Sequence, residues 1–152
     1  MFAKEHAGTT WALHALDVAV VSGKLSAADV APAIQLNFAD MRDDVVAVGS
    51  LTWTALGADL LDDALTIAER GVELTRKKSP RELAALAQVH LARHEREAAV
   101  EALQLAVDLQ PGNRRVAAEL DDARHTAGVS QDRLETWRVA STKWAQLFYG
   151  VD

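Results

Sequence analysis

The stretch that decides the fold is SPRELAALAQVHLARHEREAAVEALQLAVDLQPGN, residues 79–113. It opens with Ser79-Pro80-Arg81-Glu82, which combines a serine N-cap, a proline at the first helical position and a glutamate three residues after the serine, the pattern of a capping box. Apolar residues then recur at spacings of three and four, which predicts a helix up to a short break at residues 93–95. A second helix follows over residues 96–109 and ends before Pro111-Gly112. The stretch therefore predicts a helical hairpin.

The rest of the chain divides at glycines and short polar segments into six more helices. Only 3 prolines and 8 glycines occur in 152 residues, and no segment alternates long enough to indicate a strand. The sequence therefore predicts an all-α fold of about eight helices. The six further helices are expected at Thr10–Val21, Ser26–Phe38, Asp43–Leu56, Asp59–Thr75, Arg114–Ala127 and Ser130–Tyr149.

The helices recur as hairpins. The first helix of each begins near residue 10, 43, 80 or 113, a period typical of helix-turn-helix repeats. The predicted hairpins cover residues 10–38, 43–77, 80–110 and 113–149. At an offset of 35, Ala64 pairs with Ala99, Ala68 with Leu103 and Gly71 with Ala106. Small residues at these positions let neighbouring helices approach closely, so we expect one domain of four stacked hairpins, an α-solenoid.

Residues 83–111 resemble the tetratricopeptide repeat. The family has tryptophan, leucine-glycine, tyrosine, alanine, a large residue, alanine and proline at fixed spacing, and the corresponding residues here are Leu83, Leu86-Ala87, His90, Ala99, Leu103, Ala106 and Pro111. The resemblance is best over 80–113 and weakens towards both ends. In the last hairpin Asp121 and Arg133 stand where small residues are expected, which indicates a polar capping pair with a C-terminal capping helix.

This resemblance implies a protein-interaction module that binds a peptide or partner domain in a helical groove. The groove would be lined by the first helix of each hairpin. We expect six residues to line it: Arg81, Ala84, Gln88, Arg114, Arg115 and Glu119. Ala84 and Gln88 stand where chaperone-binding relatives carry a basic and amide pair, so we expect no binding of chaperone tails.

The last predicted helix carries an apolar seam. Leu134, Trp137, Ser141, Trp144 and Phe148 follow one another at spacings of three and four. The seam either packs on the preceding helices and closes the solenoid, or it is partly exposed and docks a partner or a second copy of the chain. In the second case Trp137, Trp144 and Phe148 would be interface residues.

The sequence gives little support for catalysis. There is no cysteine, no glycine-rich phosphate loop and no G-x-S-x-G elbow. His90 with His94, and Asp121 with His125, are four apart on predicted helices, but local structural contacts account for such pairs. We therefore expect no cofactor and no metal. Two alternatives remain open: a helical accessory domain of a larger bacterial enzyme, or a helical protein that binds a ligand or metal through His90, His94 or His125.

The charge pattern bears on the partners. The chain carries 22 acidic and 16 basic residues, for a formal net charge of -6, and has no extended basic patch. We therefore expect no nucleic-acid binding. No apolar run approaches the length needed to span a bilayer, so we expect no membrane partner. These features predict a cytoplasmic protein, although the lack of cysteine also fits an export compartment.

Overall fold

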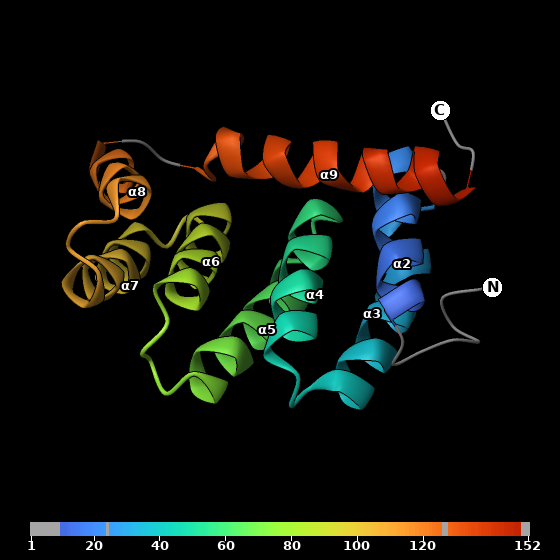
Figure 1. The fold of residues 1–152 in the computed structure, drawn as a ribbon, viewed down its shortest axis with the longest axis horizontal. Helices are drawn as coiled ribbons and strands as arrows, with labels where there is room; N and C mark the ends of the chain where they lie inside the picture. The colour runs from blue at the N-terminus through green and yellow to red at the C-terminus, as the bar shows by residue number, and fades with distance from the viewer. Residues whose placement is uncertain (1–9, 24, 126–127, 150–152) are drawn as a thin grey trace.

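The computed structural model describes residues 10–23, 25–125 and 128–149. These residues form only α-helices and no strands, so the all-α prediction is confirmed (Figure 1). The helices are α2 (Thr10–Ser22), α3 (Ala27–Met41), α4 (Val45–Gly57), α5 (Leu61–Leu74), α6 (Pro80–Ala92), α7 (Arg96–Leu109), α8 (Arg114–His125) and α9 (Gln131–Tyr149). Their bounds lie close to the predicted ones.

The helices from α2 to α8 stack in two rows. Each of them packs against the next one in the chain, so that neighbouring helices form pairs. The helices α2, α4, α6 and α8 also contact one another in succession, whereas α3, α5 and α7 lie on the other side (Figure 1). This is the arrangement expected of a helical-repeat fold, and it gives the molecule an inner row of first helices and an outer row of second helices.

Local capping explains where several helices begin. Ser26 forms a complete capping box, because its Oγ accepts from the Asp29 N–H and the Asp29 carboxylate accepts from the Ser26 N–H. Asp44 accepts from two backbone N–H groups at the start of α4. Ser79 is the N-cap of α6, but its hydroxyl bonds the Glu82 carboxylate and makes no bond to the backbone. The capping box predicted there is therefore incomplete.

The small residues predicted at helix contacts are buried. Ala64, Ala99 and Ala106 have no exposed surface, and Gly71 is buried as well. A Cβ at Gly71 would stand 3.4 Å from Val48, which shows how closely α5 approaches α4. The buried apolar residues form two clusters, one mainly in α2–α5 and one in α5–α8, and Leu86 of α6 packs against both. The hairpins therefore share a continuous core.

Helix α9 does not complete a fourth hairpin with α8. It runs back across the ends of the inner helices and packs on α2 and α4 (Figure 1). The hairpin expected over residues 113–149 is thus replaced by a short α8 that ends the stack and a long α9 that returns to the first hairpin. The partners of α9 are therefore the inner helices, whose ends it crosses (Figure 1).

Replacing Ala99 or Ala106 by leucine should destabilise the fold by about 1–3 kcal/mol, because each site is fully enclosed and the added atoms force neighbouring helices apart. Urea unfolding of the two variants measures the loss. Ala117→Leu, at an exposed position of α8, is the control and should change the free energy of unfolding by less than about 0.5 kcal/mol. Equal effects at all three positions would mean that the packing faces are assigned incorrectly.

Candidate functional site

A buried polar network joins α6, α8 and α9. The Glu119 side chain of α8 is only 6% exposed, and its carboxylate accepts from Arg133 Nε at 2.6 Å and from Gln88 Nε2 at 3.1 Å. The Gln88 side-chain oxygen in turn accepts from the Ser130 N–H at 2.7 Å. Every member of this network has a partner, so the buried carboxylate is both neutralised and hydrogen-bonded. The network fixes the start of α9 on the inner row.

Three of the predicted groove residues meet here. Gln88 and Glu119 belong to the network, and the Arg115 guanidinium lies 3.7 Å from Glu119 and 3.5 Å from Asp132. The resemblance to a helical repeat predicts that these side chains are open to a partner. In the structure they hold a segment of the same chain, because Arg133 of α9 supplies the cation that the buried Glu119 requires.

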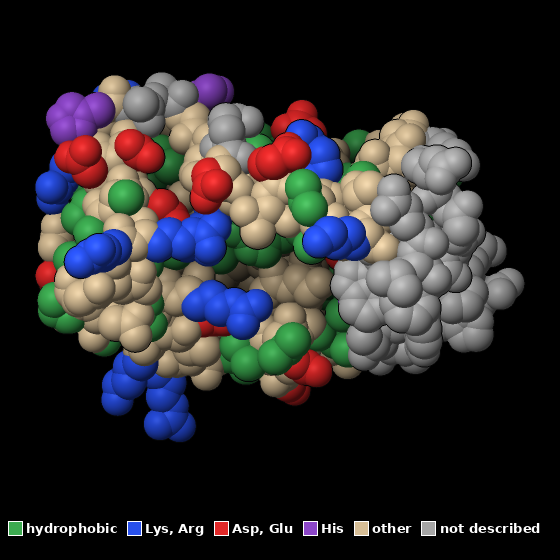
Figure 2. Space-filling view, turned by 45° about the horizontal axis from the view of Figure 1, so that its top comes forward, with side chains coloured by type: hydrophobic (Ala, Val, Ile, Leu, Met, Phe, Trp, Pro, Cys, Tyr) green, Lys and Arg blue, Asp and Glu red, His purple; other side chains and the backbone are tan. Residues whose placement is uncertain are grey.

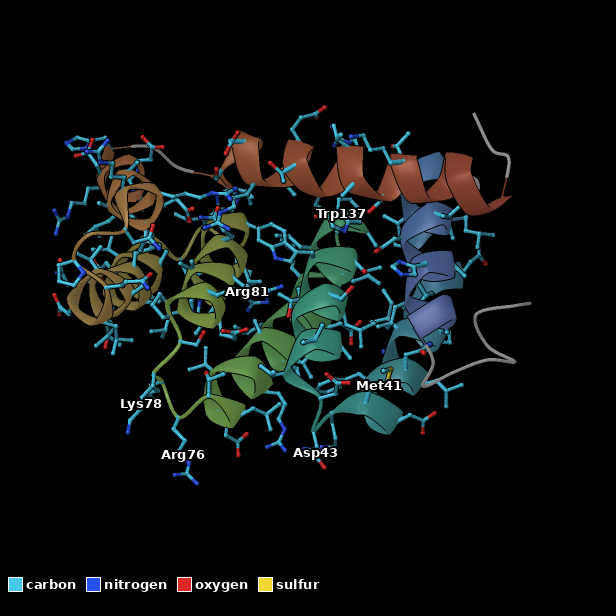
Figure 3. The ribbon with its side chains drawn as sticks, in the orientation of Figure 1. Met41, Asp43, Arg76, Lys78, Arg81 and Trp137 are labelled. Atoms are coloured by element: carbon cyan, nitrogen blue, oxygen red, sulfur yellow. The ribbon has the colours of Figure 1, made fainter. Side chains whose placement is uncertain are left out.

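The other predicted groove residues differ in exposure. Arg81 is exposed, lines a small crevice with Trp53 and Gly49, and has no ion-pair partner among the described residues (Figure 3). Arg114 is exposed too. Figure 2 shows lysine or arginine side chains beside a hollow in the surface. The expectation that Ala84 is exposed is wrong, since it is 1% exposed within the second core cluster. Helix α6 packs against neighbours in both rows, which leaves little of its surface free.

The side chain of Trp137 packs α9 against the end of α4 (Figure 3). Its ring lies so close to Gly57 that a Cβ built there would stand 2.4 Å from the nearest ring carbon. Leu134, one turn earlier, packs against the first core cluster, and Ser141, one turn later, is buried. This part of the apolar seam therefore packs on the preceding helices. The side chains of Trp144 and Phe148 lie outside the described part of the chain.

A buried carboxyl group lies beneath α9. Asp17 of α2 is 8% exposed, and burial raises its pKa to about 6, against the opposing effects of Thr54 and Trp137. The indole Nε1 of Trp137 is itself buried and has no hydrogen-bond partner of regular geometry, yet it lies close enough to Asp17 to act on that pKa. Within the described part of the chain, the junction of α2, α4 and α9 thus buries a carboxyl group whose hydrogen-bonding neighbours are neutral.

The hydrogen bonds of Thr54 agree with a neutral Asp17. Its Oγ1 lies within hydrogen-bond distance of both Asp17 Oδ1 and the Ser50 carbonyl, the latter at 3.0 Å. A hydroxyl has only one proton to donate. Both contacts are made at once when protonated Asp17 donates to Thr54 and Thr54 donates to Ser50. Burial and hydrogen bonding therefore favour the same protonation state.

The histidines considered as metal ligands have local partners. His90 Nδ1 lies 2.6 Å from Glu95, and His125 Nδ1 lies 2.8 Å from the Asp121 carbonyl. His94 is exposed at the end of α6, where its φ of 62° is left-handed. Within the described residues no three histidine or acidic side chains come together in a way that could hold a metal ion. The structure therefore does not bring the predicted pairs together into one site.

Comparisons with known proteins give no family for this chain. No protein-family model, no curated protein and no solved structure matches it. In the described residues, no helix has the length and apolar character that a bilayer crossing demands. The site must therefore be interpreted from its own geometry.

Sequence reasoning missed the group formed by Asp17, Thr54 and Gly57. The one signal was Asp17 itself, an acid that interrupts the apolar run of residues 11–21. A charge within an apolar helix face indicates a buried polar contact, but its partners come from helices far away in the sequence. Gly57 follows directly on the helix predicted over Asp43–Leu56, and nothing in the sequence shows that it also leaves room for the ring of Trp137.

Asp17 should make the protein less stable as the pH rises. Its folded pKa of about 6 exceeds the ordinary 3.8, so the stability it contributes is complete below pH 4 and is lost as the pH passes 6. The loss amounts to about 3 kcal/mol. Asp17→Asn keeps a donor for Thr54, the N–H of its side-chain amide, and removes this loss. In thermal melts, the melting temperature of Asp17→Asn should rise relative to that of the native chain between pH 4.5 and 7.5. A difference in melting temperature that stays constant over this range would contradict the raised pKa of Asp17.

A methyl group at Gly57 should loosen α9. Gly57→Ala places its Cβ against the Trp137 ring, which must move, at a cost of about 1–3 kcal/mol. Gly49→Ala is the matched control in the same helix, because nothing lies within 4 Å of its Cβ. It should stabilise α4 by about 0.5–1 kcal/mol. Hydrogen exchange of the α9 amides should become faster only in Gly57→Ala. The same exchange rates in both variants would contradict the packing of the Trp137 ring on Gly57.

Proposed function

We propose that this chain is a protein-interaction module whose concave side binds a helical segment of a partner. The observation that carries the proposal is the way α9 lies on the inner helices. Two side chains of α9 hold it there: Arg133 pairs with Glu119, and the ring of Trp137 packs on Gly57. Arg133 and Trp137 are four residues apart and lie on one face of α9. This is how an amphipathic helix is recognised in a groove, with anchors one turn apart.

The resemblance to tetratricopeptide repeats supports the same proposal. Modules of that kind hold peptides or helices on the side lined by their first helices. Here α9 packs on two of those first helices, α2 and α4. Helix α9 would then act as an internal occupant of the partner site. Because it is tethered, its effective concentration is on the order of millimolar, and a partner must bind tightly enough to displace it.

A peptide of residues 130–149 tests this proposal. The host is the full chain with Arg133→Glu, in which the tethered helix loses its pairing with Glu119. The labelled native peptide should bind this host saturably in fluorescence anisotropy, because it restores the pairing from outside. The native chain should bind it at least about tenfold more weakly, since its own α9 competes.

The control host carries both Arg133→Glu and Glu119→Gln. It keeps the released helix but lacks the acidic anchor, so peptide binding should weaken again. Circular dichroism checks that both hosts remain helical. If the peptide binds neither folded host, the concave side is not a helix-binding groove.

A further inference from the structure

Glu119 and Asp17, two buried acidic side chains near α9, differ in the charge of their partners. Glu119 is paired with Arg133 and bonded by Gln88. Among the described residues, the side chains that act on the pKa of Asp17 are neutral, the hydroxyl of Thr54 and the indole of Trp137. Both side chains are buried, with 6% of Glu119 and 8% of Asp17 exposed. The tethered helix therefore satisfies one acidic position of the groove and leaves the other without a cation.

The residues of α9 that lie over these acids are one helical turn apart. Arg133 lies over Glu119, and four residues later Trp137 brings its ring to Gly57 and its indole N–H near Asp17. That N–H is buried and has no regular hydrogen bond. A buried acid that has neutral donors and no cation weakens the docking of α9 once it ionises. The groove is therefore better suited to another occupant than to its own helix.

We propose that the partner of this groove is an amphipathic helix with two cationic residues four positions apart, the first bound by Glu119 and the second by Asp17. This inference rests on the proposed function and names its partner class. An arginine side chain is long enough to extend from the Trp137 position to the carboxyl group that the indole approaches. Its guanidinium would replace a neutral donor by a charge-assisted hydrogen bond.

The charge of the whole chain supports a basic partner. The formal net charge is -6, so a cationic helix is attracted over the distance at which two proteins meet. A second copy of the chain is a poorer occupant, because its α9 carries tryptophan and not a cation at the second position. Exchange of α9 between copies would gain nothing over the tethered arrangement.

Three synthetic peptides of residues 130–149 separate these occupants: the native sequence, Trp137→Arg and Trp137→Leu. Each is titrated into the full chain carrying Arg133→Glu at pH 7.5. The Trp137→Arg peptide should bind at least about tenfold tighter than the Trp137→Leu peptide, the scale of a close charge pair. In a host that also carries Asp17→Asn, the two peptides should bind alike.

The relative affinities of the three peptides decide between these occupants. The inference is overturned if the Trp137→Arg and Trp137→Leu peptides bind the Arg133→Glu host, which keeps Asp17, with equal affinity. It is also overturned if the Trp137→Arg peptide still binds more tightly when the host carries Asp17→Asn, because that preference would show only a general attraction to an acidic surface. Tightest binding by the native peptide overturns it in favour of α9 from a second copy. Failure of all three peptides on a folded host rejects the proposed function itself.

A second measurement does not depend on peptide binding. In the full chain with native Arg133, Trp137→Arg should melt at a higher temperature than Trp137→Leu, because the guanidinium pairs with Asp17 within the chain. The advantage should disappear when both variants also carry Asp17→Asn. An advantage of the same size on the Asp17→Asn background would contradict the pairing.

Discussion

The carboxylate of Glu119 is the constraint on which the path of α9 depends. A carboxylate that is 6% exposed must be paired and hydrogen-bonded, or the fold loses several kcal/mol. Gln88 supplies a neutral donor from α6, but the close cation comes from Arg133. The need to neutralise one buried acid on α8 therefore ties α9 to the inner row, and the bond from Ser130 to Gln88 fixes where α9 begins.

The polar outer side of α8 explains why α9 does not form a hairpin with it. Asp121 stands 34 residues after Ala87, which is fully buried where α6 meets its neighbours. The Asp121 side chain is exposed and lies 3.6 Å from that of His125. A second helix could not approach α8 closely without burying this acid. Helix α8 thus ends the stack, as solenoid caps do, and α9 is left to return across the concave side.

Local signals predicted most of the fold, and contacts distant in the sequence account for the rest. Helix bounds follow from caps, breaks and apolar spacing, and the offset of Ala64 and Ala99 predicted their shared burial. Of the site, Gln88 and Glu119 were found by position, but their partner was not, because nothing in residues 131–149 shows which helices that segment packs on. The burial of Ala84 and the place of Asp17 depend in the same way on several helices meeting at once.

Hydrogen exchange of α9 in the full-length Glu119→Gln variant measures how much the Glu119–Arg133 pair holds this helix in place. Removing the charge leaves Arg133 without its partner, and breaking a buried pair costs up to about 3–5 kcal/mol. The account predicts that α9 amides exchange at least about tenfold faster while α5 and α7 stay unchanged. Glu135→Gln, at an exposed position of α9 itself, should leave exchange as it is. Unchanged protection of α9 in Glu119→Gln would show that this pair does not hold the helix on the concave side.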